Sequence, residues 1–451
     1  MGDPPEPPER LEPSEQGKPV EPSRSPDPPG RLSRAGAMVR GLAIDVTPLR
    51  QARDFRLLWT GQLISLTGRQ ITTVAVPFQV FLLTRSSLAV GLIGLVEVVP
   101  LVVFGIAGGP ISDRVDRRRL LLGTEAGLSV TSSLLFLGAL SGHPPLGYVY
   151  AVTGLQAGLM GVNAPTRSAA VPNLVSRAHL PAAMALTQVL YNTSMIVGPA
   201  LAGLILAHLG LSWAYAIDVL TYSASITAVL LLRPMPPRRD AEGEATTGWQ
   251  AVKEGFAFLR GKRVLVSTFL IDLDAMIFGM PRAVFPVLAL TVFHVGPQGL
   301  GLLYAAPAVG ALAGALTAGW VGRVRHRGRA VIWAVVLWGA AITGFGLSGG
   351  FFLLGLGFLA FAGAADVISA VFRGTILQLM VPDALRGRLS AINIMVVTGG
   401  PRVGDVEAGA VASLVSPWFS VVTGGVACVL GALLLAKRYP ELGRSHADDP
   451  F

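Results

Sequence analysis

Charged side chains are scarce in this chain of 451 residues. Asp, Glu, Lys and Arg make up only 14% of it, whereas they make up about 25% of an average soluble domain. Apolar residues account for 52%, and glycine contributes 54 more residues. Because a soluble domain of this size needs more polar surface, the composition excludes a cytosolic enzyme, a coiled coil and a disulfide-rich scaffold.

Cysteine and the common catalytic patterns are also missing. Cys428 is the single cysteine and lies inside an apolar run, so no intramolecular disulfide can form. The six histidines lack metal-ligand spacing, and no Gly-x-x-x-x-Gly-Lys-Ser/Thr phosphate loop occurs. No nucleophile, base and oxyanion set is visible either. We therefore expect no catalytic residues, no metal site and no cofactor, with a proton gradient rather than ATP as the energy source.

Long apolar runs are abundant instead. Each has about 20 residues, the length that crosses roughly 30 Å of hydrocarbon. Lipid cannot satisfy backbone polar groups, so such runs must be helices. The sequence therefore predicts an all-α membrane protein with twelve transmembrane helices. The predicted spans cover residues 57–83, 87–110, 120–141, 146–168, 182–208, 212–232, 264–291, 298–322, 330–348, 350–378, 389–415 and 417–436.

The basic residues between the runs predict the orientation in the membrane. Arginine and lysine gather before the first span, in every second loop and after the last span, whereas the alternate loops hold almost only Arg85. The positive-inside rule then places both termini in the cytoplasm. This placement also explains the net charge of +9 without a nucleic-acid partner.

The segments outside the spans set the predicted domain boundaries. Residues 1–40 are rich in Pro, Glu, Ser and Arg and contain no apolar run, which is typical of a disordered tail and not of a signal peptide. The long loop 233–263 ends in a basic stretch that predicts an amphipathic helix on the membrane surface, with a plain linker as the alternative. The predicted parts are a tail (1–48), a six-helix half (49–233), a cytoplasmic loop (234–263), a second six-helix half (264–438) and a tail (439–451).

A weak internal repeat supports two related halves. The repeated elements are Gly109 with Arg117 and Arg119, echoed by Gly319 with Arg327 and Arg329; Val171-Pro172-Asn173, echoed by Val381-Pro382-Asp383; and Gly198-Pro199, echoed by Gly400-Pro401. Two halves of related sequence are typical of transporters whose binding site lies near the middle of the membrane between the halves.

The loop after the second run carries a family resemblance. Residues 109–119 read Gly-Pro-Ile-Ser-Asp-Arg-Val-Asp-Arg-Arg-Arg. This segment, the signature loop below, resembles the Gly-x-x-x-Asp-Arg-x-Gly-Arg-Arg loop of the major facilitator superfamily. Asp116 in place of the second glycine, together with the stretches 163–167 and 301–306, is similar to the branch that contains the enterobactin exporter and related drug exporters. The resemblance runs from about residue 50 to 440. It implies two pseudo-symmetric six-helix halves whose spans 1, 4, 7 and 10 line a central cavity.

The signature loop also predicts a gate. Asp113 is an acid at the end of span 2, where it would face the positive end of a neighbouring helix. Arg114 and Arg117 would meet carboxylates or lipid phosphates, and Gly109 opens the loop. Contacts that form in one state and break in the other make a gate. Ordinary positive-inside charge is the alternative, and we prefer it for the two arginines that end the loop.

Ionisable residues inside the spans are costly and are therefore functional candidates. We predict acids that carry protons and arginines that pair with them, with permanent ion pairs between helices as the alternative. Asp272 is the first choice among the acids and Asp366 the second. The proton-coupling candidates are Asp272, Asp274, Asp366 and Glu97, and the predicted charge partners in the cavity are Arg69 and Arg282.

Three further features receive structural or gating interpretations. The pairs Gly198-Pro199 and Gly400-Pro401 are predicted to bend spans 5 and 11, because proline removes an intrahelical hydrogen bond. Arg402 and Asp405 are three residues apart and are predicted to pair on one helix face. Asp218 lies on an outward-facing span, so we expect a capping or interface role for it rather than one in transport.

These features predict a secondary active transporter of the cell membrane. We favour a proton-coupled exporter, an antiporter for a small molecule such as a siderophore or a drug, that works by alternating access as a monomer in contact with membrane lipid. An importer on the same fold is one alternative. A non-transporting membrane sensor or scaffold is the other.

Overall fold

The computed structural model describes residues 2, 45–236 and 248–444. Most of the predicted N-terminal tail and about half of the C-terminal one lie outside these residues, although a short helix already begins at Thr47. The side chains of a few helical residues, Asp113 among them, also lie outside the described part.

Helices build the described part of the chain, and no strand occurs in it. The helices before residue 237 are α2 (Thr47–Gln51), α3 (Arg53–Thr84), α4 (Ser87–Arg114), α5 (Arg117–Leu140), α6 (Leu146–Leu174), η1 (Arg177–His179), α7 (Leu180–His208) and α8 (Leu211–Leu230). Those after residue 247 are α9 (Gly248–Leu259), α10 (Arg263–Phe278), η2 (Arg282–Val284), α11 (Phe285–Val287), η3 (Leu288–Val292), α12 (Gly296–Thr317), η4 (Ala318–Arg323), α13 (Arg327–Gly346), α14 (Phe352–Met380), α15 (Asp383–Leu414), α16 (Pro417–Arg438) and α17 (Pro440–Arg444).

Nine helical segments within residues 45–236 and 248–444 are long and apolar enough to cross a membrane. The other three long helices, α3, α6 and α15, carry charged or amide side chains along their middle, such as Arg69, Asn163 and Arg402. Together these segments occupy the ranges of the twelve predicted spans. The all-α membrane fold is therefore confirmed, and the predicted number of spans fits it.

The segment that was predicted as one continuous span over 264–291 is interrupted. Helix α10 ends at Phe278, and the chain continues through the 3-10 turn η2, the short helix α11 and the π-helical turn η3. Pro281 and Pro286 lie in this stretch, and proline removes a backbone donor and clashes with the preceding turn. The indole nitrogen of Trp338 on α13 donates to the carbonyl of Gly279, 2.8 Å away, so a side chain satisfies a carbonyl that the helix leaves free.

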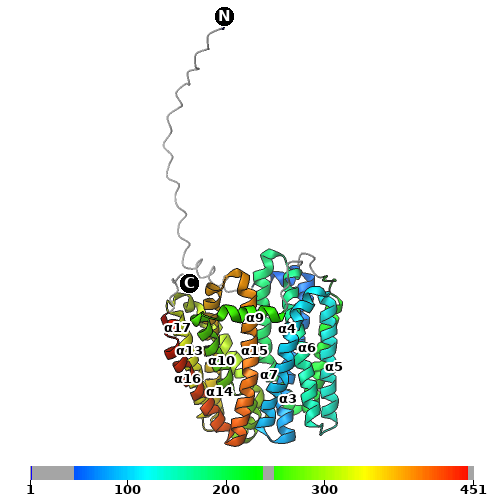
Figure 1. Cartoon of the computed structure of the whole chain (residues 1–451). Helices are drawn as coiled ribbons and strands as arrows, with labels where there is room; N and C mark the ends of the chain where they lie inside the picture. The colour runs from blue at the N-terminus through cyan, green and yellow to red at the C-terminus, as the bar shows by residue number, and fades with distance from the viewer. Residues whose placement is uncertain (1, 3–44, 237–247, 445–451) are drawn as a thin grey trace, which may run out of the picture. The chain divides into compact units, whose positions relative to one another are not determined.

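The helices pack as two groups, α3–α8 and α10–α16 (Figure 1). The groups meet along α4 with α15 and along α7 with α12. Glycines permit these contacts: a Cβ atom on Gly409 would lie 3.0 Å from the Cα atom of Gly91, and one on Gly301 would lie 2.9 Å from that of Gly203. Such close approach of helices through small residues is a characteristic of membrane bundles.

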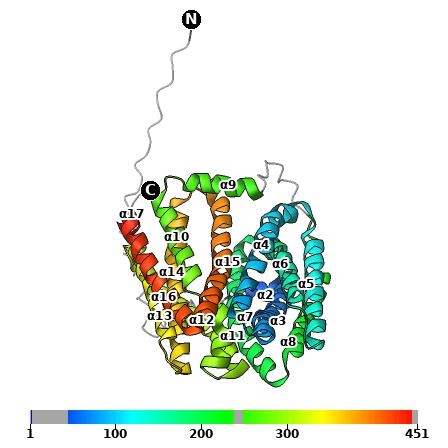
Figure 2. The same ribbon diagram turned by 60° about the horizontal axis from the view of Figure 1, so that its bottom comes forward.

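Helix α9 marks one end of the bundle. It lies across the ends of the helices in Figure 2 and contacts α15, α4 and α10. Leu259 of α9 packs with Leu389 in the second turn of α15, whereas Phe256 and Lys253 are exposed. Because successive long helices run in alternate directions, both glycine contacts lie toward the opposite end. That end is closed by direct backbone packing.

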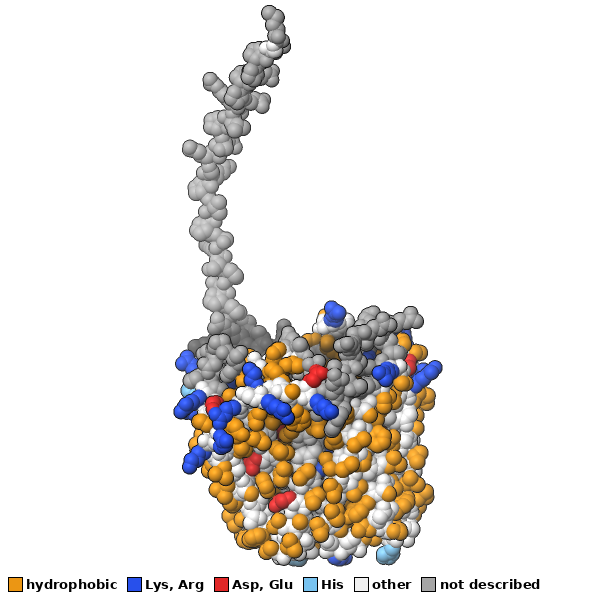
Figure 3. Space-filling view, viewed as in Figure 1, with side chains coloured by type: hydrophobic (Ala, Val, Ile, Leu, Met, Phe, Trp, Pro, Cys, Tyr) orange, Lys and Arg blue, Asp and Glu red, His pale blue; other side chains and the backbone are white. Residues whose placement is uncertain are grey.

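The surface matches a membrane environment. Figure 3 shows hydrophobic side chains over the sides of the bundle and a rim of Lys and Arg near the α9 end. Leu353 is 81% exposed and Leu220 is 65% exposed. Exposed apolar side chains over a wide area mark a surface that contacts lipid or another protein.

Candidate functional site

The main cavity lies between the two groups of helices and has a volume of about 330 Å³. Sites for small molecules usually measure about 300–1,000 Å³. Residues from α3, α4, α6 and α7 form one side, and residues from η2, α12 and α15 form the other. The three long helices that are too polar to pass as simple membrane spans, α3, α6 and α15, all line it. The charged residues of the lining are Arg69, Glu97, Arg282, Arg402 and Asp405.

An ion pair crosses this cavity from one group to the other. Arg402 Nε on α15 lies 3.0 Å from Glu97 Oε2 on α4, and Asp405 Oδ1 accepts a hydrogen bond from the backbone N–H of Ala283, 3.0 Å away. The predicted pair between Arg402 and Asp405 is thus replaced by two contacts to other helices. The reason is the close approach of α4: a Cβ atom on Gly94 would lie 2.3 Å from the carbonyl oxygen of Arg402, which places Glu97, three residues further on, beside the guanidinium.

A second cavity of about 180 Å³ lies within reach of the first. The two cavities share Thr73, Arg282 and Tyr304 in their linings. Asp366 and Trp338 line only the second one. Arg282, on the break after α10, therefore lies between the two cavities. Both arginines that were expected in the cavity, Arg69 and Arg282, belong to the lining of the main cavity.

The acids on α10 and α14 share a cation that the sequence did not single out. Arg373 on α14 forms a buried ion pair with Asp272 on α10. The other guanidinium nitrogen of Arg373 lies 3.9 Å from Asp366 Oδ1. The predicted partners, Arg69 and Arg282, are not in contact with these acids. Arg373 falls inside the predicted span 350–378 and lies two turns before the end of α14, and this depth in the membrane was the available signal.

Asp274 does not face either cavity. On α10 it stands two residues after Asp272, and two residues rotate by about 200° around a helix. It therefore points to α16, where a Cβ atom on Gly431 would lie 2.0 Å from its Oδ1. The predicted span therefore lines the cavities only through its interrupted part, residues 279–285, and neither of the two acids on α10 belongs to a lining. Asp274 is the less suitable proton carrier.

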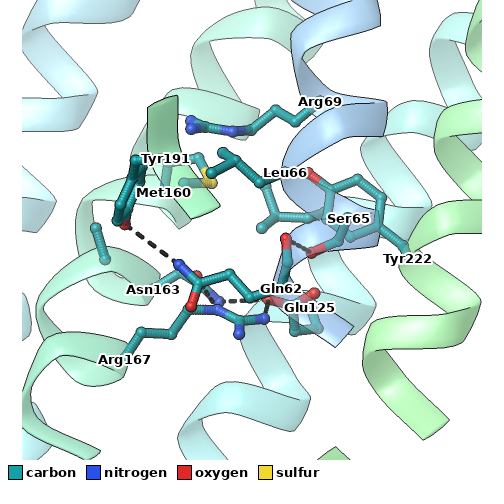
Figure 4. A pocket seen from close by; sticks show the side chains of 12 residues that line it. Gln62, Ser65, Leu66, Arg69, Glu125, Met160, Asn163, Arg167, Tyr191 and Tyr222 are labelled. Carbon is teal, nitrogen blue, oxygen red and sulfur yellow. Dashed lines mark hydrogen bonds and ion pairs between the residues drawn. The ribbon is translucent and has the colours of Figure 1, made fainter. Parts of the chain in front are cut away.

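A small polar side chamber of about 30 Å³ adjoins the main cavity (Figure 4). Glu125 on α5 forms a buried ion pair with Arg167 on α6 and accepts from the Asn163 amide, 2.9 Å away. Arg167 also donates to Ser225 Oγ on α8, 2.8 Å away. The chamber and the main cavity share several lining residues, among them Arg69 and Tyr191. The first group of helices thus contains its own buried arginine network.

The signature loop is tied to the end of α8. Asp116 caps α5, because its Oδ1 accepts from the backbone N–H of Arg119, 3.1 Å away. Its other oxygen accepts from the backbone N–H of Met235, also 3.1 Å away. The residue that departs from the superfamily pattern therefore has a definite structural function. Arg114 is exposed, Arg117 is buried, and Gly109 has open space around its Cα atom.

The two Gly-Pro pairs have matching positions in the two groups. A Cβ atom on Gly198 would lie 2.3 Å from the Cβ of Gln70 on α3, and one on Gly400 would lie 2.8 Å from the Cβ of Met276 on α10. Pro199 and Pro401 follow without ending their helices, because α7 and α15 continue for several turns. Each pair thus brings its helix against the first long helix of its own group.

A metal centre finds no support in the described ranges. No group of three or more His, Cys, Asp or Glu side chains there could hold a metal ion. Cys428 is buried between α16 and α13, with its sulfur 3.9 Å from the carbonyl oxygen of Val335.

A membrane-spanning helical bundle with a polar cavity between two groups of helices is the architecture of a secondary transporter. Residues 43–448 match the family described as transmembrane secretion effectors of the major facilitator type, and the chain belongs to this family. The enterobactin exporter EntS of Citrobacter koseri is 28% identical over 410 residues, which cover 90% of this chain and 97% of that protein. EntS of Escherichia coli is 27% identical over the same shares. The resemblance in the sequence is confirmed, and the chain is a secondary transporter that exports a small molecule.

Solved structures support the same fold. The nucleoside transporter NupG superposes with a TM-score of 0.66 at 13% identity, over 85% of this chain and 98% of that one. A bacterial homologue of the human lysosomal transporter Spinster superposes with a TM-score of 0.68 at 15% identity, over 89% and 99% of the two chains. At these identities the likeness concerns the fold alone.

Proposed function

We propose that the chain exports a siderophore-class small molecule in exchange for protons. The names of the EntS relatives, which match over nearly their full length, support the substrate class. The adjoining main and second cavities support a substrate larger than either space alone. The observation that carries proton exchange is the position of Arg373 between two acids, Asp272 and Asp366.

The geometry favours Asp366 as the carrier of the exchanged proton. Asp366 lines the second cavity with its side chain 26% exposed, whereas Asp272 is 2% exposed and lines neither cavity. Asp366 can therefore exchange a proton with cavity water, and Asp272 holds the guanidinium of Arg373 in place. A proton on Asp366 leaves Arg373 with one anionic partner, and its release gives the guanidinium two. The sequence ranked the two acids in the opposite order.

Alternating access would use the contacts between the two groups. The glycine contacts of α4 with α15 and of α7 with α12 close the end opposite α9. Opening that end requires these contacts to separate, and the α9 end must then close. We propose that the signature loop with Asp113 acts as the gate at the α9 end. We further propose that both termini face the cytoplasm and that a monomer in contact with lipid is the working unit.

The test is transport by the purified chain in proteoliposomes. Enterobactin should accumulate against its gradient when a pH gradient is imposed, and an ionophore that collapses the pH gradient should abolish the accumulation. Asp366→Asn should still bind enterobactin and exchange it downhill, but it should not build a gradient. Asp274→Asn is the matched control, because this acid faces α16 rather than the cavity.

Two outcomes would contradict the proposal. Accumulation that persists without a pH gradient would exclude proton coupling. Full uphill transport by Asp366→Asn would move the proton carrier to another acid, with Glu97 next because it lines the main cavity.

A further inference from the structure

Asp218 on α8 is a buried acid without a cation in contact. It is 0% exposed, and none of the ion pairs between described residues includes it. Its Oδ2 accepts hydrogen bonds from two hydroxyl groups, Thr72 Oγ1 on α3 and Ser132 Oγ on α5, each 2.7 Å away. Its Oδ1 has no hydrogen-bond partner. The interface position expected from the sequence agrees with this burial, but a simple packing role leaves the acid unexplained.

Among the described residues, one cation lies near enough to act on Asp218. That cation is Arg69 on α3, three residues before Thr72, which influences Asp218 electrostatically without forming an ion pair with it. Tyr215 and Tyr222 lie three residues before and four residues after the acid on its own helix. On the other packed helices, Glu125 of α5 and Arg167 of α6 are paired with each other. An acid at membrane depth whose contacts are hydroxyl groups is a functional candidate by default.

Hydroxyl groups connect Asp218 with the main cavity. Thr72 both lines the cavity and donates to the acid. Gln156 also lines the cavity and donates to Ser132 Oγ, 3.2 Å away, so the proton of the Ser132 hydroxyl remains directed at Asp218. Arg69 lines the cavity as well. The acid is therefore one side chain away from the main cavity, where we propose that the substrate binds.

We propose that Asp218 is a second proton-binding site of this transporter, which exchanges protons with the main cavity through Thr72; the proposal rests on the proton-coupled function above. In the transfer, the Thr72 hydroxyl gives its proton to the carboxylate and takes one from a hydronium ion in the cavity, which becomes water. The hydroxyl is thereby restored, and the net change is one proton moved from the cavity to Asp218. Release follows the same steps in reverse. Ser132 and Gln156 act as positioning residues.

Arg69 supplies the coupling to the substrate. While its guanidinium stays near Asp218, the field of the cation stabilises the carboxylate anion. A substrate group in the main cavity that attracts Arg69 withdraws this stabilisation and favours the protonated acid. The first group of helices then contributes a proton site of its own, apart from Asp366 in the second group.

Infrared difference spectroscopy tests the proposal without substrate or gradient. The full chain in lipid nanodiscs is titrated between acidic and alkaline pH, and the carbonyl stretch of protonated carboxylic acids is recorded. We expect one titrating band to be lost in Asp218→Asn and to be retained in Asp274→Asn, which removes another acid that faces neither cavity. Thr72→Val should keep the band but slow its response to a pH jump by roughly 10²-fold, whereas Thr72→Ser, which keeps the hydroxyl, should respond at the original rate.

Each remaining outcome overturns the proposal. If the difference spectrum of Asp218→Asn superposes on that of the original chain, Asp218 does not exchange protons. If Thr72→Val responds as fast as Thr72→Ser, the hydroxyl relay is wrong; this result stands even where Asp218→Asn fails to fold. If a pH gradient does not drive efflux in proteoliposomes, proton-coupled export is refuted, but the infrared spectra of Asp218 do not depend on that result. The failure of the proposed function and the failure of this inference are therefore distinguishable.

Discussion

The two groups of helices each bury an arginine on their fourth long helix, but the two arginines have different partners. Arg167 on α6 contacts a single acid, Glu125, and its other bonds go to an amide and a hydroxyl. Arg373 on α14 is shared by two acids, Asp272 and Asp366. No second acid among the described residues forms an ion pair with Arg167, so we expect its network to be a static link between α5 and α6. Arg373 has two, and one of them lines a cavity, so protonation can redistribute its contacts.

Removal of each arginine in turn is expected to have the largest effect on the two networks. Arg167→Gln and Arg373→Gln each leave a buried carboxylate without its cation, which costs about 3–5 kcal/mol. We therefore expect both variants to lose thermal stability in detergent, measured as the temperature at which the monomer peak disappears in size-exclusion chromatography after heating.

Neutralising the acid as well separates the two networks. Arg167→Gln with Glu125→Gln should regain both stability and pH-driven efflux, because the pair has only a structural function. Arg373→Gln with Asp272→Asn should regain stability but not efflux. Recovery of efflux in this second double variant would show that Arg373 is also only a static link.

The long elements were predictable from the sequence, whereas the pairing of charges was not. Apolar length locates nine of the spans within the described residues, because lipid leaves the backbone no alternative to a helix. Which charges meet depends on how far each helix is rotated and how closely neighbours approach. Glycine at position 94 sets the approach of α4 to α15, and this approach diverts Arg402 from Asp405 to Glu97. Such contacts join residues far apart in the chain, and no local pattern records them.

Other features of the site do have a signal in the sequence. Arg373 lies inside the predicted span 350–378, so its depth marked it as a candidate of the same kind as Asp366. Asp272 and Asp274 are two residues apart, which already prevents both from facing one cavity. Pro281 and Pro286 indicated the interruption after α10. The hydroxyl contacts of Asp218 gave no sequence signal, because Thr72 and Ser132 are ordinary residues of other helices.

The contacts between the groups provide the next test. Gly203→Ala and Gly409→Ala would place a Cβ atom 2.8 Å and 2.6 Å from backbone oxygens of the facing helices. Overpacking of this kind costs about 1–3 kcal/mol, and here the cost falls on the state in which the end opposite α9 is closed. We expect faster labelling of a cysteine at Thr73, which lines both cavities, by an impermeant thiol reagent from that side in a Cys428→Ala background.

Gly147→Ala is the control for the glycine variants. Nothing lies within 4 Å of the position its Cβ would take, so the labelling rate should not change. Equal rates in all three variants would mean that the glycine contacts do not limit opening.

The starts of α5 and α13 allow a smaller comparison, since they occupy matching places in the two groups. Asp116 caps α5 with its side chain, whereas the residue at the same place before α13, His326, makes no such cap. Loss of a cap costs about 0.5–2 kcal/mol, so Asp116→Ala should lower thermal stability modestly, and Asp116→Asn should retain most of it.

Asp113→Asn should leave stability unchanged and slow transport, which separates the proposed gate from the cap. Loss of stability in Asp113→Asn with normal transport would contradict the gating function.

The smallest effect is expected at Glu97, which joins the groups rather than lying within one. Both Glu97 and Arg402 have about a quarter of their side-chain surface exposed, and ion pairs with solvent access contribute only about 0.2–1 kcal/mol. Glu97→Gln should therefore shift the balance between the two states by roughly fivefold at most, visible as a small increase in the labelling rate at Thr73→Cys. Glu97→Asp serves as the control that keeps the charge. Complete loss of pH-driven efflux in Glu97→Gln would be a far larger effect than the loss of a weak ion pair between helices can cause. It would make Glu97 a proton carrier on the first group, opposite Asp366 on the second.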